Sequence, residues 1–175
     1  PGIISPAALG QGPDILARAR STGLKSQRER DYVDALETFF RDHQTRDHRS
    51  RAKALETAMA QVMHRYPQDK EAATLYALVL SANFDPADRQ YANQLKAAAI
   101  LEPIFKEQPQ HPGVAHYLIH SYDYPPIAKH GLDAARRYSR IAPDAAHALH
   151  MPSHIFTRVG AWKESIESNR ESARV

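Results

Sequence analysis

The sequence predicts an all-helical protein made of helical hairpins in tandem. Along most of the chain, apolar residues recur at intervals of three and four, which places them on one side of a helix. Sustained alternation of polar and apolar residues is missing, and so are Asn-Gly and Asp-Gly hairpin turns. Residues 109–160 also nearly repeat themselves after 34 positions, a period typical of repeats made of a helix, a turn and a second helix.

Residues 1–25 predict an irregular lead-in. Their prolines and glycines leave room for one short helix, from about Asp14 to Ser21. Gly23 would close this helix, because glycine readily adopts the left-handed conformation that ends many helices. The pattern changes at Ser26, which has the capping-box spacing to Glu29 and therefore predicts the start of a helix.

Residues 26–175 predict a helical repeat domain. Proline sets several boundaries, because it opens a helix at the first position and breaks one in the interior. The hairpins are expected at residues 27–66, 69–107, 112–142 and 145–174. In stacked hairpins each apolar face is covered by a neighbour. The apolar Trp162 and Ile166 on the last helix therefore predict missing C-terminal repeats or a homodimer contact.

The composition is that of an ordinary globular protein, with 42% hydrophobic and 25% charged residues. The 23 basic and 20 acidic residues are interspersed and show no basic stripe of the kind that binds nucleic acid. We therefore expect no nucleic-acid partner. The absence of cysteine excludes disulfides, thiolate metal sites and thiol catalysis.

No apolar run approaches the roughly 18 residues that a transmembrane helix needs. We therefore expect a soluble protein without a membrane span. The sequence lacks an initiator methionine and a basic-then-apolar leader. It is expected either to have lost a signal segment or to be part of a longer protein.

Histidines stand at matching points of the 34-residue repeat, His116 with His150 and His120 with His154. Residues four apart lie on one side of a helix, so each helix should present two imidazoles together. Neighbouring helices pack about 8–10 Å apart, which would let the four imidazoles meet. His147 is a further candidate, since it precedes His150 by three residues.

An all-histidine set suits zinc, copper or nickel better than calcium or magnesium. The candidate metal ligands are His116, His120, His150 and His154, with His147 as a possible fifth. Asp123 could orient a ligand from behind, as carboxylates often do for metal-bound histidine. The sequence indicates no other cofactor.

Two strings in the chain resemble a known family. They run from His111 to His120 (HPGVAHYLIH) and from His147 to Phe156 (HALHMPSHIF). Pro143, Gly160 and Trp162 also stand where a tetratricopeptide repeat has its opening proline, turn glycine and aromatic residue. From about Ser26 onward the chain resembles a group of bacterial tetratricopeptide-repeat proteins with no assigned biochemical role.

The resemblance implies a right-handed superhelix, an α-α solenoid, whose first helices line a concave groove for a peptide or protein. The expected groove residues are His116, Tyr117, His120, Asp123, Tyr124, His147, His150, His154 and Arg158, with Glu71 entering from the second hairpin. Two functions stay open: a protein- or peptide-binding scaffold, and a transition-metal-binding protein that uses the groove histidines. The compartment, bacterial cytoplasm or periplasm, also stays open.

Pro152 departs from the general repeat, which has an interior helical residue at that point. Proline there removes a backbone hydrogen bond and clashes with the preceding turn. The alternative is a helix that begins at Pro152 and leaves His147 and His150 in the loop before it.

Catalysis has less support in the sequence than binding. Metalloproteases carry a glutamate directly after the first histidine of the pair as general base, but Tyr117 and Met151 stand there. A Gly-x-Ser-x-Gly elbow and a phosphate-binding glycine loop are missing as well. Glu71 stays a candidate base, yet exposed helical glutamates are usually solvated. The sequence therefore favours a role without catalysis.

Overall fold

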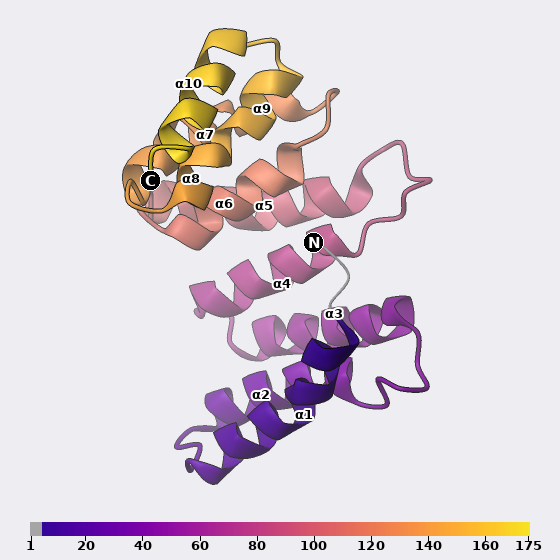
Figure 1. Ribbon diagram of the computed structural model, residues 1–175. Coiled ribbons are helices and arrows are strands. Elements are labelled where there is room, and N and C mark those ends of the chain that lie inside the picture. The colour runs from indigo at the N-terminus through magenta and orange to yellow at the C-terminus, as the bar shows by residue number, and fades with distance from the viewer. Residues whose placement is uncertain (1–4) are drawn as a thin grey trace. The chain divides into compact units, whose positions relative to one another are not determined.

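The computed structural model describes residues 5–175, and every regular element in that range is a helix (Figure 1). The predicted all-α class is therefore confirmed. The chain forms two compact units, Pro1–Asp85 and Pro86–Val175. Within residues 5–175 no helix is both long and apolar enough to cross a membrane, in line with the prediction. Residues 1–4 of the expected lead-in lie outside the described range.

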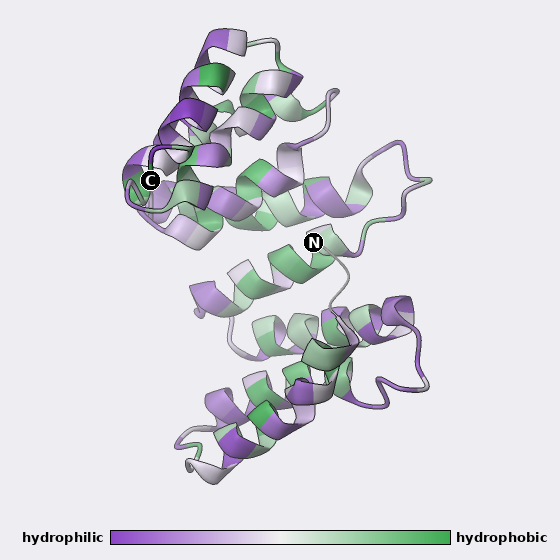
Figure 2. Ribbon diagram, in the orientation of Figure 1, coloured by the Kyte–Doolittle hydropathy of each residue, from purple (hydrophilic) through white to green (hydrophobic). Residues whose placement is uncertain are grey.

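The first unit contains α1 (Pro6–Ser21), α2 (Gln27–Phe40), α3 (His48–Arg65) and α4 (Lys70–Ala82). Each of these helices packs against the next one in the chain. α2 and α3 pack against each other, and the expected capping box is present at Ser26 and Glu29. Figure 2 shows apolar and polar residues interleaved along these helices, as expected when one side of each helix is buried.

α1 is longer than the short helix expected at residues 14–21. It begins at Pro6, because the Ser5 hydroxyl accepts a hydrogen bond from the Ala8 N–H at 3.2 Å and proline suits the first helical position. Gly12 does not break the helix. A Cβ at Gly12 would collide with the ring of Phe40, so this glycine lets α1 and α2 approach closely.

Asp69 connects the start of α4 to α2. Its carboxylate caps α4 by accepting hydrogen bonds from the Glu71 and Ala72 N–H groups at 3.1 and 3.3 Å. It also accepts hydrogen bonds from the Tyr32 hydroxyl at 2.8 Å and from the Arg28 guanidinium. Burial alone would raise the pKa of the Asp69 carboxyl, but the hydrogen bonds from Arg28 and Tyr32 outweigh it and hold the pKa below 3.8.

We expect Asp69→Asn to lower the free energy of unfolding by about 1–3 kcal/mol at neutral pH, because an amide cannot accept all of these bonds. A carboxyl with a lowered folded-state pKa stabilises the fold above its unfolded-state pKa. That contribution is lost as the pH falls through the folded-state pKa, so the difference from the parent should shrink towards about pH 3. Urea unfolding at both pH values measures it, with the exposed Asp14→Asn as control. A difference that does not change with pH would contradict the assignment.

The second unit contains α5 (Ala92–Glu107), α6 (Pro112–Tyr122), the 3-10 helix η1 (Ala128–Gly131), α7 (Leu132–Ile141), α8 (Ala146–His150), α9 (Pro152–Arg158) and α10 (Trp162–Ser172). α6 packs against α7, and α10 packs against both α8 and α9. The hairpin expected at residues 69–107 is divided, because α4 belongs to the first unit and α5 to the second. Its pairing stays a prediction.

The last repeat opens with two short helices in place of one long one. α8 ends at His150, and α9 begins at Pro152, which has no N–H to donate. Met151 between them keeps a helical backbone, with φ −53° and ψ −37°. A helix does start at Pro152, but His147 and His150 lie in α8 and not in a loop.

α10 turns a polar side to its neighbours. Ser172 donates a hydrogen bond to the Ala146 carbonyl of α8 at 2.7 Å, and Ser168 donates one to the Leu149 carbonyl. Trp162 and Ile166 lie on the solvent side, with 63% and 58% of their surface exposed. The predicted partner for this apolar side stays a prediction.

Gly131 at the end of η1 lies very close to α9. A Cβ there would be 2.8 Å from Ile155 Cδ1 and 3.1 Å from Tyr122 Cβ. Its φ of −80° suits any residue, so glycine is needed for packing alone. Ile155 is fully buried, and it follows His154 directly within α9. The contact with Gly131 therefore helps to fix the position of His154.

We expect Gly131→Ala to lower the free energy of unfolding by about 1–3 kcal/mol, because the added methyl group overpacks the contact with Ile155. Thermal or urea unfolding checks this. Gly10→Ala in α1 is the matched control, since a Cβ there has no atom within 4 Å. The packing argument fails if Gly131→Ala is as stable as the parent.

Candidate functional site

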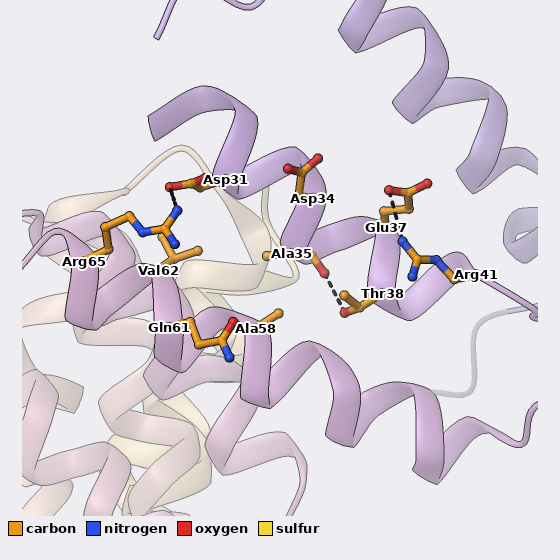
Figure 3. Close-up of a pocket in the computed structure, with 10 residues that line it drawn as sticks. All are labelled: Asp31, Asp34, Ala35, Glu37, Thr38, Arg41, Ala58, Gln61, Val62 and Arg65. Carbon is orange, nitrogen blue, oxygen red and sulfur yellow. Dashed lines mark hydrogen bonds and ion pairs between the residues drawn. The ribbon is translucent and has the colours of Figure 1, made fainter. Parts of the chain in front are cut away.

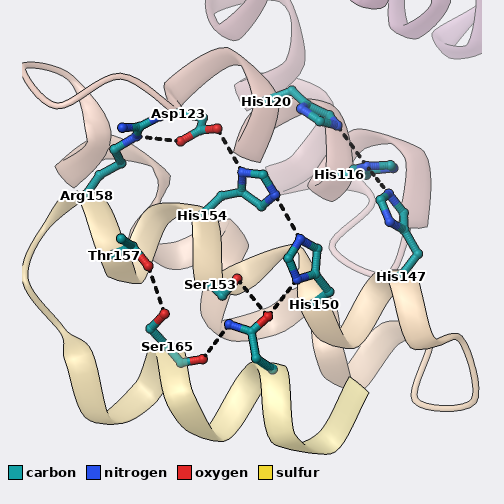
Figure 4. A network of polar contacts seen from close by, with 11 residues as sticks. His116, His120, Asp123, His147, His150, Ser153, His154, Thr157, Arg158 and Ser165 are labelled. Atoms are coloured by element: carbon teal, nitrogen blue, oxygen red, sulfur yellow. Dashed lines mark hydrogen bonds and ion pairs between the residues drawn. The ribbon is translucent and has the colours of Figure 1, made fainter. Parts of the chain in front are cut away.

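Five histidines of the second unit lie close together in a ring of imidazoles (Figure 4). This histidine cluster consists of His116 and His120 from α6, His147 and His150 from α8, and His154 from α9. In the order 116, 120, 154, 150, 147 and back to 116, neighbouring ring centroids are 4.7, 6.3, 4.9, 6.4 and 4.9 Å apart. The structure thus brings together all the histidines that the sequence singles out as ligands.

Three members form a histidine trio around His116. Its Nε2 atom lies 3.0 Å from Nε2 of His120 and 3.2 Å from Nε2 of His147. The His116 ring also stacks on Tyr138 of α7, with 5.4 Å between ring centroids and 18° between planes, and on Tyr117 at 5.5 Å and 30°. These rings restrict the orientation of His116, so its Nε2 atom faces the other two imidazoles.

The other two members form a histidine pair. Nε2 of His150 lies 3.1 Å from Nε2 of His154. The outer nitrogens of both rings are occupied: Nδ1 of His154 is 2.9 Å from Asp123 Oδ2, and Nδ1 of His150 is 2.7 Å from Asn169 Oδ1. Figure 4 shows the two inner nitrogens pointing at each other.

The partner of His154 determines where its proton sits. Burial alone would raise the pKa of Asp123, but hydrogen bonds from His154 and Arg158 outweigh it and lower the pKa. Asp123 is therefore an ionised carboxylate, which can only accept hydrogen bonds. Nδ1 of His154 must donate, so Nε2 carries the lone pair whenever the ring is neutral.

The partner of His150 leads to the same result. The amide nitrogen of Asn169 donates to the Ser165 carbonyl at 2.9 Å, which turns Oδ1 of Asn169 towards His150. Nδ1 of His150 therefore donates, and its Nε2 carries the lone pair whenever the ring is neutral. With both rings neutral, the histidine pair places two acceptors face to face.

Burial and the neighbouring imidazoles keep His116, the central residue of the histidine trio, neutral. Burial, followed by the neighbouring imidazoles, lowers the pKa of His116 from 6.5 to about 4. Partial removal from water and the nearby His154 also lower the pKa of His120, although that residue is exposed on one side. A neutral imidazole offers a lone pair, which is the form that binds metal ions.

Of the remaining predicted groove residues, some belong to the polar network around the histidine cluster and others do not. Asp123 and Arg158 belong to the polar network, where Arg158 Nε donates to Asp123 Oδ1 at 2.9 Å. Tyr117 stacks on His116, and the ring of Tyr124 lies 5.1 Å from that of Tyr91. Glu71 lies in the first turn of α4, so it is not among the groups that the second unit brings together.

Sequence reasoning missed Asn169 and Tyr138. Asn169 lies on α10, four residues after Ser165, and Tyr138 lies buried on α7. The available signal was a polar stripe at helical spacing on α10, whereas the prediction for this helix considered only its apolar Trp162 and Ile166.

A separate hollow of about 500 Å³ lies in the first unit between α2 and α3 (Figure 3). Each of its charged groups is paired: Arg65 with Asp31 at 2.7 Å, Arg41 with Glu37 at 3.5 Å, and Asp34 with Arg20 of α1. Its charged lining therefore belongs to the packing of the first unit.

Within residues 5–175, no group of three or more histidine, aspartate or glutamate side chains is arranged so that it could hold a metal ion. In the histidine trio, His116 Nε2 lies within 3.2 Å of two other Nε2 atoms. A metal ion at the trio would therefore require its imidazoles to turn from these positions.

Comparison with protein-family models, with curated proteins and with solved structures finds no match for this chain. The tetratricopeptide resemblance, its superhelix and its groove therefore stay predictions. The site has to be understood from its own geometry.

We expect Asp123→Asn to release the fixed tautomer of His154, because the charged acceptor of its Nδ1–H is lost. Long-range proton–nitrogen NMR of the imidazoles in chelator-treated protein should then show a mixture of tautomers for His154. The free energy of unfolding should fall by about 1 kcal/mol. Asp133→Asn, which alters an exposed carboxylate of α7, is the control. An unchanged His154 spectrum would show that Asp123 does not set the tautomer.

Proposed function

We propose that the second unit binds zinc, copper or nickel at the histidine cluster. The observation that carries the proposal is the position of His116 Nε2, within 3.2 Å of Nε2 in both His120 and His147. Metal–nitrogen bonds of 2.0–2.1 Å at tetrahedral angles put two ligand nitrogens about 3.3–3.4 Å apart. The two contacts of His116 are therefore only slightly shorter than the spacing between two ligands of one ion.

Hydrogen bonding alone is a poor account of the trio. The Nε2 atom of a neutral imidazole has a single in-plane direction, in which it either donates or accepts one good hydrogen bond. His116 has two such partners, His120 and His147, so one of the contacts gains little. A metal ion between the rings would use all three lone pairs at once.

The chemistry of the donors narrows the choice of ion. Neutral imidazole suits zinc, copper and nickel, whereas calcium and magnesium prefer oxygen ligands. The lowered pKa of His116 supports binding, because a proton does not compete for its lone pair at neutral pH. Peptide binding in a groove, expected from the resemblance, stays a prediction, since none of these contacts identifies a peptide.

We expect untagged protein, stripped with a chelator and dialysed against Zn²⁺, to retain zinc by elemental analysis. An ion that binds only the folded chain stabilises it by about 2.7 kcal/mol at 100 times its Kd, so the thermal midpoint should rise. His116→Ala combined with His150→Ala changes one ligand in the trio and one in the pair. This double variant should bind no zinc and show no rise.

The matched control is His64→Ala combined with His130→Ala, which removes two exposed histidines outside the cluster. It should bind zinc as the parent does, and far-UV circular dichroism should confirm that both double variants are helical. A parent without bound zinc, copper or nickel would sink the proposal. So would a folded cluster variant that binds as much metal as the parent.

A further inference from the structure

The histidine pair is not spaced as part of one large site with the trio. Ring centroids are 4.7 and 4.9 Å apart within the trio and 4.9 Å apart within the pair. Between the two groups the neighbouring centroids are 6.3 and 6.4 Å apart. The five imidazoles therefore gather around two centres.

The geometry of the histidine pair itself favours a cation between the two rings. Asp123 and Asn169 hold Nδ1 of His154 and of His150, so the two Nε2 atoms face each other at 3.1 Å. When both rings are neutral these are two acceptors, which repel each other at that distance, and the partial burial of both residues reduces the screening of the repulsion. A positive ion between the two nitrogens turns the repulsion into coordination.

The outer hydrogen bonds have the arrangement that metal-bound histidine usually shows. Such a ligand donates its second N–H to a carboxylate or carbonyl oxygen, which fixes the ring and makes it a stronger base. Asp123 fulfils this for His154 and is itself held by Arg158. Asn169 fulfils it for His150 through its side-chain carbonyl oxygen.

We propose that the cluster holds two transition-metal ions, one at the trio and a second between His150 and His154. This inference rests on the proposed function. The second ion has only two protein ligands, so a tetrahedral ion there keeps positions open for outside ligands. Neutral imidazoles leave its charge uncompensated, and the open positions should therefore take a small anion such as azide or a carboxylate.

Zinc content of the untagged full chain tests the two positions separately. We expect two ions per chain in the parent and in the exposed control His64→Ala. We expect one ion in His116→Ala, which damages the trio, and one in His150→Ala, which damages the pair. If either variant is not helical by circular dichroism, His147→Ala replaces the first and His154→Ala the second.

The outcomes separate the inference from the proposed function. One ion in the parent that both variants lose means a single shared site, and one ion that only His116→Ala loses means that a proton occupies the pair. Either result overturns the second position but leaves metal binding intact. A parent without any ion overturns both proposals.

Azide tests the open position directly. In Co²⁺-loaded His116→Ala the remaining ion lies at the pair, and adding azide should change its visible absorption. An unchanged spectrum would contradict an open position between His150 and His154.

Discussion

A neutral imidazole has one N–H and one lone pair, and this limit governs the histidine cluster. Once the outer nitrogen donates to a fixed acceptor, the inner nitrogen can only accept. Asp123 and Asn169 impose that state on His154 and His150. His116 meets the same limit in another way, because two imidazoles approach its one free direction. The inner nitrogens of the cluster therefore cannot all be paired by hydrogen bonds to one another, and the proposed metal ion would take up their lone pairs.

The helical fold supplies the crowding that brings these nitrogens together. Fully buried apolar residues stand next to the histidines, Ile119 before His120 and Ile155 after His154, and they fix α6 and α9 in the core. α10 contributes differently, because its polar side both binds the carbonyls of α8 and carries Asn169. Helix packing and the orientation of the imidazoles are thus parts of one arrangement.

Local signals in the sequence predicted the helices and the pairing of four histidines of the cluster. Periodicity and the cap at Ser26 indicate where helices form. The four-residue spacing places His116 beside His120, because the backbone geometry of a helix alone determines which residues share a side. The role of Gly12 was misjudged, since its small size serves a contact with Phe40. Asn169 was missed because its contact with His150 joins two helices, and no spacing along the chain encodes such a contact.

Anomalous X-ray diffraction at the zinc absorption edge, from crystals of the untagged chain grown with Zn²⁺, tests metal binding most directly. The account predicts anomalous density among the Nε2 atoms of the histidine cluster, with the strongest peak beside His116. Density only at exposed histidines outside the cluster, such as His64, would contradict it.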